Sequence, residues 1–287
     1  MLDDFAVFIL THGRADNVIT YDTLRKGGYT GKIYLVIDNM DKTADSYYEK
    51  YGDEVLMFDK EEIAKKVDHG DNFNDLRTTT HVRNAIFDLA EQVGKKYFLA
   101  LDDDYTNFTY RINQNKEYPK GAFIPRKTLN EVFSATLDFY KSVPTISSIC
   151  FSQGGDWFGG GTNQMANGYK LKRKAMNSFF CSTDRRFWFI SRMNEDVNTY
   201  LTLGSVGKLF FTTPLFSLDQ VSTQANEGGM TETYLDNGTY IKSFFTVMYC
   251  PSFTKVSQMG RTNKRIHYSV NWNNAAPMIL SEEYKKV

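Results

Sequence analysis

Short apolar runs recur through the first hundred residues, separated by stretches in which polar and apolar positions mix. Each run is too short to form a helix that buries one face, and continuous apolar runs of this length are typical of strands buried on both faces. The runs predict four strands, at Phe5–Leu10, Lys32–Ile37, Val55–Phe58 and Tyr97–Leu101.

The stretches between these runs have helical periodicity. Residues from Asn17 to Lys26 place Ile19, Thr23 and Leu24 on one face and stop at a pair of glycines. Tyr47–Tyr51 and Thr79–Val93 are the other predicted helices, and the second is the stronger because its apolar residues fall three and four apart. Strands that alternate with helices predict an α/β fold with a mostly parallel central sheet.

Polar side chains follow the predicted strands. Thr11 and Arg14 follow the first, and Asp38 follows the second. The carboxyl ends of parallel strands meet at one edge of the sheet, where open α/β sheets bind their ligands, so a nucleotide is expected there. The sequence has neither Gly-x-Gly-x-x-Gly nor Gly-Lys-Ser/Thr, which disfavours dinucleotide-binding and P-loop proteins.

Three consecutive aspartates, Asp102, Asp103 and Asp104, close the fourth apolar run. Side chains alternate along a strand, so Asp102 and Asp104 are expected to point one way and Asp103 the other. Neighbouring carboxylates repel one another unless a cation neutralises them. Mg²⁺ and Mn²⁺ prefer oxygen ligands. The triplet therefore indicates a divalent metal site.

Composition adds little to this picture. The 287 residues carry 34 basic and 34 acidic side chains, but residues 144–287 hold 15 basic and 10 acidic ones, which is compatible with an anionic acceptor. The three cysteines, Cys150, Cys181 and Cys250, have no metal-binding spacing and lie among apolar or small neighbours. They favour a reducing compartment. No signal peptide or membrane span is recognisable, so a cytoplasmic protein without a membrane partner is expected.

In the second half, Phe187–Ile190 is expected to form another strand and Val197–Leu203 a helix. Glu195 and Asp196 stand directly before that helix. Acidic residues at a helix N-terminus interact favourably with the helix dipole, so this pair has a purely structural explanation as well as a catalytic one.

The stretch from Thr78 through Asp104 resembles the family 2 glycosyltransferases of the GT-A fold. Those enzymes carry an Ala-Arg-Asn helix start and then a strand that ends in an acidic DxD-type motif. Here the matching residues are Val82-Arg83-Asn84 and Phe98-Leu99-Ala100-Leu101-Asp102-Asp103-Asp104. The resemblance covers roughly residues 5–110. It implies a single Rossmann-like GT-A domain that binds a nucleoside diphosphate sugar, a UDP-sugar foremost, through Mn²⁺ or Mg²⁺.

The same resemblance implies roles for particular side chains. The donor would contact a set of six residues and the metal a set of three, with Asp102 in both. The donor set is Thr11, Arg14, Asp38, Arg83, Asp102 and Asp103, and the metal set is Asp104, Asp102 and His267. Basic residues beside His267 would neutralise the leaving diphosphate.

Inverting GT-A enzymes also carry an x-Glu-Asp motif, and Glu195-Asp196 resembles it in type and order. In those enzymes the last carboxylate is the catalytic base, so Asp196 is the expected base. Glu195 is the alternative and would otherwise orient the acceptor or the sugar. A base must lie within hydrogen-bond reach of the hydroxyl that attacks the anomeric carbon.

Two segments are candidates for acceptor contacts. Trp157 lies in a glycine-rich segment and could stack on a sugar or a flipped base. Lys172 and Arg173 belong to a basic run, extended by Arg185-Arg186, which could bind a phosphate backbone or form a solvated face. The chain also resembles, more loosely, the TET/JBP-associated glycosyltransferases, which glucosylate hydroxymethylated pyrimidines in the DNA of phages and kinetoplastids. That resemblance implies a modified DNA acceptor and, for a phage protein, the host cytoplasm.

We therefore expect residues 1–110 to form the nucleotide-sugar half and residues 111–287 the acceptor half of one domain. A nucleotidyltransferase is the alternative enzyme, although Thr11-His12-Gly13-Arg14 lacks the lysine of its usual phosphate loop. A nucleic-acid-binding module without activity is the third possibility. The sequence names neither the sugar nor the acceptor, and it leaves the oligomeric state open.

Overall fold

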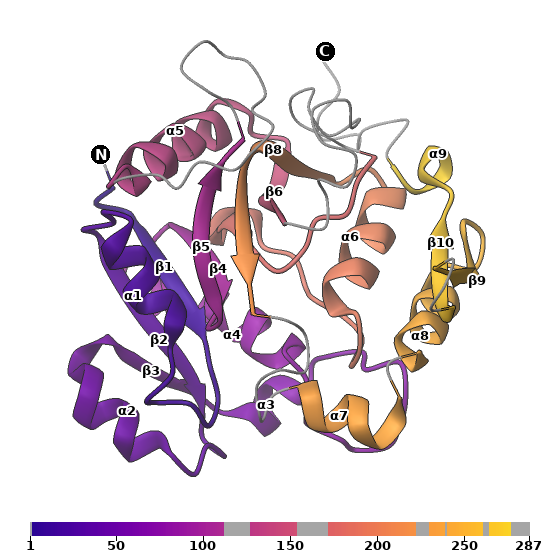
Figure 1. Ribbon diagram of the computed structural model, residues 1–287, viewed down its shortest axis with the longest axis horizontal. Coiled ribbons are helices and arrows are strands. Elements are labelled where there is room, and N and C mark those ends of the chain that lie inside the picture. Colours follow the sequence, from indigo (N-terminus) through magenta and orange to yellow (C-terminus); the bar gives the residue numbers. More distant parts are fainter. Residues whose placement is uncertain are drawn as a thin grey trace.

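The computed structural model describes residues 2–111, 127–153, 172–221, 230–238, 240–260 and 264–276. Eight strands form one sheet in the order β3-β2-β1-β4-β7-β6-β8-β5 (Figure 1). Their bounds are β1 Phe5–Leu10, β2 Lys32–Asp38, β3 Val55–Phe58, β4 Tyr97–Asp102, β5 Tyr105–Tyr110, β6 Ile146–Gln153, β7 Phe179–Ser182 and β8 Leu209–Gln220. A separate hairpin joins β9 Thr254–Met259 to β10 Arg265–Val270.

The first four strands of the sheet order, β3, β2, β1 and β4, are parallel, as the sequence predicted. Strand β6 also pairs with β8 in parallel, whereas β7 and β5 run antiparallel to their neighbours. Both halves of the sequence thus contribute strands to one sheet. The α/β fold with a mostly parallel sheet is confirmed, and it is consistent with a GT-A, Rossmann-like domain.

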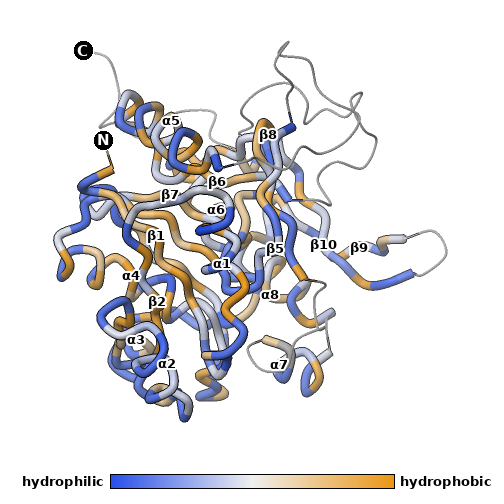
Figure 2. The backbone as a smooth tube through the Cα atoms, turned by 60° about the vertical axis from the view of Figure 1, so that its left-hand side comes forward, coloured by the Kyte–Doolittle hydropathy of each residue, from blue (hydrophilic) through white to orange (hydrophobic). Residues whose placement is uncertain are grey.

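Helices cover both faces of the sheet (Figures 1 and 2). Alternate side chains of β1 enter two different cores. Phe5, Val7 and Ile9 pack with α1, α2 and α5, and the residues between them pack with α3, α4 and α6. This two-sided burial explains why the run is continuously apolar. The helices are α1 Ile19–Lys26, α2 Ala44–Tyr51, α3 Lys60–Ala64, α4 Thr80–Gln92, α5 Leu129–Ser142, α6 Glu195–Ser205, α7 Met230–Asn237, α8 Ile241–Tyr249 and α9 Trp272–Ala275.

The predicted strand at Phe187–Ile190 is wrong. This segment belongs to neither sheet, although Phe187 and Phe189 in it are buried. The side chain of Asn84 on α4 binds its backbone instead. Nδ2 of Asn84 donates to the Phe189 carbonyl at 2.9 Å, and the Phe189 N–H donates to Oδ1 of Asn84 at 2.8 Å. A side-chain amide thus takes the place of a neighbouring strand.

The three cysteines are free and buried, as expected from their apolar surroundings. In the part of the chain that the structure describes, no helix has both the length and the apolar character needed to cross a membrane.

Candidate active site

A pocket of about 430 Å³ opens at the carboxyl edge of the sheet, where β1, β2 and β4 end. Nine of the residues singled out from the sequence line it: Thr11, Arg14, Asp38, Arg83, Asp102, Asp103, Asp104, Glu195 and Asp196. The parallel register explains the grouping, because Leu10 of β1 is paired with both Val36 of β2 and Asp102 of β4. The first half of the chain thus lines one side of the pocket, and the start of α6 lines another.

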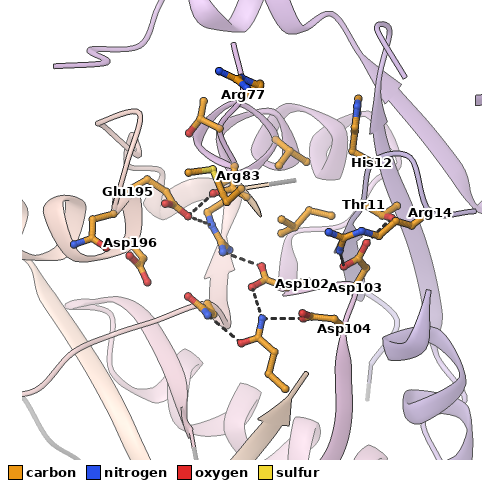
Figure 3. Close-up of a pocket in the computed structure, with 18 of the residues that line it drawn as sticks. Thr11, His12, Arg14, Arg77, Arg83, Asp102, Asp103, Asp104, Glu195 and Asp196 are labelled. Carbon is orange, nitrogen blue, oxygen red and sulfur yellow. Dashed lines mark hydrogen bonds and ion pairs between the residues drawn. The ribbon is translucent and has the colours of Figure 1, made fainter. Parts of the chain in front are cut away.

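Asp103 faces the loop after β1, away from its two neighbours (Figure 3). Thr11 donates a hydrogen bond of 2.8 Å to Oδ2 of Asp103, and Nη1 of Arg14 lies 2.9 Å from Oδ1. The Thr11 hydroxyl also lies 2.7 Å from the phenol of Tyr47 on α2. Burial raises the pKa of Asp103 while the Arg14 charge opposes that change. The middle aspartate therefore fixes the loop that follows β1.

Asp102 is paired with a buried arginine. Nη2 of Arg83 donates to Oδ1 of Asp102 at 2.9 Å, and Nε of the same side chain donates to Glu195 at 3.0 Å (Figure 3). Arg83 is only 2% exposed, and its Nη1 has no hydrogen-bond partner among the described residues. Burial raises the pKa of Asp102 to about 7 despite the Arg83 charge, with nearby carboxylates adding to the rise. Arg83 thus joins the acidic triplet to the Glu195-Asp196 pair.

Asp104 accepts its hydrogen bond from a neutral amide, whereas Asp102 and Asp103 each pair with a charged arginine. Nε2 of Gln220, at the end of β8, donates to Oδ1 of Asp104 at 2.8 Å and lies 3.5 Å from Oδ2 of Asp102. Burial raises the pKa of Asp104, and the Gln220 hydrogen bond opposes that rise. The amide therefore sits between two carboxylates that both face the pocket, at a position where a cation would satisfy them better than a neutral N–H donor.

The carboxylates of Asp102 and Asp104 suit a hard cation whose remaining ligands come from a bound substrate and water. Among the described residues, no three His, Cys, Asp or Glu side chains form a group that could hold a metal. Mg²⁺ sites commonly use only one or two carboxylates together with substrate phosphates and waters. Asp104 and Asp102 fit that pattern, whereas a metal cage built only from protein ligands does not fit.

Asp38 forms a second charged group where β2 ends. Nδ1 of His12 lies 2.9 Å from Oδ2 of Asp38, and Nζ of Lys60 lies 3.1 Å from the same oxygen. Burial alone would raise the pKa of Asp38, but these two partners hold it at about 2. The Asp38 hydrogen bond in turn raises the pKa of His12 above its usual value. Asp38 is therefore ionised and held in a fixed orientation at the pocket wall.

Glu195 and Asp196 differ in their surroundings. Glu195 accepts hydrogen bonds from Arg83 and, at 2.5 Å, from the Thr79 hydroxyl. Asp196 accepts one from the backbone N–H of Val197 at 2.7 Å and forms no ion pair within the described chain. Burial, together with the Glu195 charge, raises the pKa of Asp196 to about 6. Asp196 is therefore the carboxylate that remains available to a substrate proton.

Helix α6 begins abruptly, which places this pair at the pocket. Asn194, the residue before the helix, adopts a left-handed conformation with φ of 56°. Its side chain donates to the hydroxyl of Thr246 on α8 at 3.0 Å. Asparagine tolerates this conformation better than most residues. The turn directs the first residues of α6 toward Arg83.

The remaining predicted site residues lie elsewhere. His267 is on β10 and does not line the pocket, so the structure does not bring it to Asp104. Lys172 is exposed and donates to Asn273 at 2.7 Å, and Arg173 is half-buried outside the pocket lining. Trp157 lies outside the described residues. Their predicted roles stay predictions.

Arg185 and Arg186, which were expected to extend the basic run, have structural partners. Arg185 donates to the backbone carbonyls of Tyr140, Val143 and Ile146, and Arg186 forms an ion pair with Asp88.

Sequence reasoning missed several lining residues. Lys60 follows β3 by two positions, so the rule that found Asp38 could have found it. Gln220 ends a strand that forms an antiparallel pair with β5, and Lys242 and Tyr234 come from the helices α8 and α7. No local pattern marks these three residues, because only the tertiary fold brings them to the pocket.

A model of the family described as TET-Associated Glycosyltransferase matches residues 5–229 of the chain. No curated protein matches the sequence. Among solved structures, S. aureus TarS is similar at 12% identity and a TM-score of 0.44, over 85% of this chain and 42% of that one. A structure of TarS residues 1–349 is similar at 11% identity and a TM-score of 0.44, over 85% of this chain and 70% of that one. This chain therefore spans less than half of the longer TarS chain.

Proposed function

Because this chain belongs to the TET-associated glycosyltransferase family, we propose that it transfers a sugar from a nucleoside diphosphate donor, a UDP-sugar foremost, to the hydroxyl of a hydroxymethylated pyrimidine in DNA. The transfer inverts the anomeric carbon and depends on Mn²⁺ or Mg²⁺. One observation carries this proposal beyond the family's general activity. The acidic triplet and the Glu195-Asp196 pair line the same pocket and are joined through Arg83.

The donor side of the proposal rests on the residues at the ends of β1, β2 and β4. Asp38 and Thr11 lie where a nucleotide would enter, at the carboxyl edge of parallel strands. Asp104 and Asp102 would hold the divalent metal, which would neutralise charge on the diphosphate of the donor. We leave His267 out of this ligand set because it does not line the pocket.

The base in this proposal is Asp196. Its carboxylate removes the proton from the acceptor hydroxyl as the hydroxyl oxygen bonds to the anomeric carbon. The bond between that carbon and the diphosphate oxygen breaks, and its electron pair leaves with the diphosphate. A pKa of about 6 leaves Asp196 ionised at neutral pH yet close enough to that pH to accept a proton. Glu195, which is held by Arg83 and Thr79, positions the guanidinium and is not the base.

The acceptor in this proposal follows from the family's description and from chemistry. The family is described as TET-associated, and a hydroxymethyl group on a pyrimidine offers the primary hydroxyl that a glycosyltransferase needs. The excess of basic residues in positions 144–287 suits a polyanionic acceptor.

The test incubates the protein with a panel of nucleotide sugars, Mn²⁺ and an oligonucleotide that contains a 5-hydroxymethylated pyrimidine. We expect nucleoside diphosphate release that depends on the oligonucleotide, together with a mass increase of one sugar on it. An oligonucleotide with methyl in place of hydroxymethyl is the matched control. Addition of a nucleotide mass would instead identify a nucleotidyltransferase, and DNA binding without turnover of any donor would identify a non-catalytic module.

A further inference from the structure

Three basic side chains come from segments near the helix that carries Asp196. Lys242 comes from α8, Lys174 precedes β7, and Arg265 lies on β10. Figure 1 shows α8 and the β9–β10 hairpin beside α6, which carries Asp196. Lys174 and Lys242 both interact electrostatically with Asp196, and both also interact with Arg265. We call Lys174, Lys242 and Arg265 the α8–β10 basic cluster.

The donor side of the pocket has different cations. Among positive charges, those of Arg83 and Arg14 act most strongly on Asp102, Asp103 and Asp104. The cluster therefore belongs to the neighbourhood of the proposed base.

Tyrosine rings hold the two lysines in place. Nζ of Lys242 lies 5.3 Å from the centre of the Tyr234 ring, and Nζ of Lys174 lies 5.3 Å from the centre of the Tyr268 ring. Contacts of this kind orient an ammonium group but do not neutralise it. Within the described chain, none of the three cluster residues forms an ion pair closer than 4 Å.

A half-buried ammonium group that lacks an ion pair destabilises the folded state. Burial lowers the pKa of both Lys174 and Lys242, and repulsion from Arg265 lowers it further, while Asp196 opposes the change in both lysines and Glu195 also opposes it in Lys242. Like charges gathered from three separate elements are unfavourable unless a ligand supplies negative charge. Phosphate is an anion whose oxygens can accept hydrogen bonds from two ammonium groups and a guanidinium together.

We propose that the α8–β10 basic cluster binds a backbone phosphate of the acceptor, next to the nucleotide whose hydroxyl meets Asp196. This inference rests on the proposed function, since it assigns the cluster to a nucleic-acid acceptor. The phosphate belongs to the acceptor because the cluster lies beside the proposed base, whereas the diphosphate of the donor belongs beside Asp104. The contact would fix the acceptor nucleotide by its backbone and leave its base free to enter the pocket.

The variants Lys174→Gln, Lys242→Gln and Arg265→Gln test this inference, with Lys255→Gln as the matched control because Lys255 is an exposed lysine on β9 of the same hairpin. The probe is a short single-stranded DNA without any hydroxymethyl group, and binding is measured by fluorescence anisotropy at several salt concentrations without donor. We expect each cluster variant to weaken binding about tenfold and to reduce the salt slope by about 0.7, the value for one lost phosphate contact on a single strand. Lys255→Gln should change neither quantity.

A second measurement separates acceptor from donor. The affinity for UDP with Mn²⁺ should be unchanged in the three cluster variants, and Lys242→Arg should restore DNA binding. Weaker UDP binding with intact DNA binding would assign the cluster to the leaving diphosphate and overturn the inference. An equal loss of DNA binding in Lys255→Gln would show that binding depends only on general surface charge, and would overturn the inference. Thermal unfolding of each variant shows whether the fold is retained, and the arginine variant decides the matter if a glutamine variant does not fold.

Different results would contradict the proposed function and the proposed phosphate site. If the wild-type protein binds unmodified DNA through the cluster but adds no sugar to hydroxymethylated DNA, the phosphate site stands and the proposed acceptor falls. If sugar transfer occurs and the cluster variants bind DNA as the wild type does, the proposed function stands and this inference falls. If the wild-type protein binds no DNA, this inference is wrong.

Discussion

Nη2 of Arg83 lies 2.9 Å from Oδ1 of Asp102, and both side chains are largely buried. The same guanidinium reaches Glu195 through Nε, so one residue of α4 ties the end of β4 to the start of α6. A planar guanidinium can donate along two directions at once, which a lysine ammonium cannot match in geometry. The relative position of the triplet and the proposed base therefore depends on this arginine.

Replacing Arg83 should cost considerable stability. Arg83→Met leaves Asp102 and Glu195 without their shared cation, and removing one partner of a buried ion pair typically costs about 3–5 kcal/mol. Urea unfolding measures the change. Arg186→Met is the matched control, because Arg186 pairs with the exposed Asp88 and such pairs contribute about 0–1 kcal/mol. Similar losses in the two variants would show that the Arg83 network does not hold the site together.

Asp104→Asn should abolish metal-dependent donor binding. A neutral amide is a poor ligand for Mn²⁺ and leaves the diphosphate charge unbalanced. Calorimetric titration of UDP with Mn²⁺, with and without EDTA, measures this effect, and the wild-type affinity should fall to that of the variant when EDTA is present. Asp103→Asn is the contrast, because Asp103 holds Thr11 and Arg14. It should keep the metal dependence but lose about 1–3 kcal/mol of stability. Binding by Asp104→Asn that equals wild type and ignores EDTA would contradict the metal site.

Much of the structure of residues 2–110 could be predicted from the sequence because local rules govern it. The strands β1 and β3 have the bounds that their apolar runs predicted, and the strand-end rule brought Thr11, Asp38 and Asp104 to one pocket. The alternation of side chains along a strand also placed Asp103 apart from its neighbours. These inferences need only the strand period and a parallel sheet.

The remaining features depend on contacts between distant parts of the chain. Phe187–Ile190 has the composition of a strand, but Asn84 binds its backbone and no strand of the described residues pairs with it. Gln220 reaches Asp104 from the far end of β8. The α8–β10 basic cluster combines residues from three segments, whereas the sequence pointed to the continuous run at Lys172 and Arg173. Periodicity carries no information about such pairings.

The His12–Asp38 pair should be visible in a pH titration. Asp38 raises the pKa of His12 above 6.5 through their hydrogen bond, against the lowering effect of burial. NMR titration of the wild-type protein should give a His12 pKa above 6.5, and Asp38→Asn should bring it to 6.5 or below. The stability that this pair contributes is fully present below pH 6.5 and is lost as the pH rises through the higher pKa of the folded state. A His12 pKa that does not respond to Asp38→Asn would remove this pair from the pocket wall.

Asp196 should reduce the stability of the fold at neutral pH. Its pKa rises from 3.8 to about 6 on folding, so the folded state binds a proton more tightly than the unfolded state does. Stability attributable to this group is highest below pH 3.8 and falls as the pH rises to about 6. Asp196→Asn removes the buried charge and should raise stability at pH 8 by about 1–3 kcal/mol, with no gain near pH 4. Urea unfolding at the two pH values in EDTA checks this, and a loss of stability at pH 8 would contradict it.

The same substitution should remove most of the activity. Asparagine is nearly isosteric with aspartate but cannot take the acceptor proton, and loss of a general base typically reduces turnover about 10²–10⁴-fold. UDP affinity should stay unchanged, because Asp104 and Arg14, not Asp196, lie on the donor side.

In the wild type, kcat/KM should rise with pH through about 6 and then level off, as the base loses its proton. Glu195→Gln should instead disturb Arg83 and weaken both stability and donor binding. A single base also requires inversion at the anomeric carbon, so a product that retains its configuration, or near-normal turnover by Asp196→Asn, would exclude Asp196 as the base.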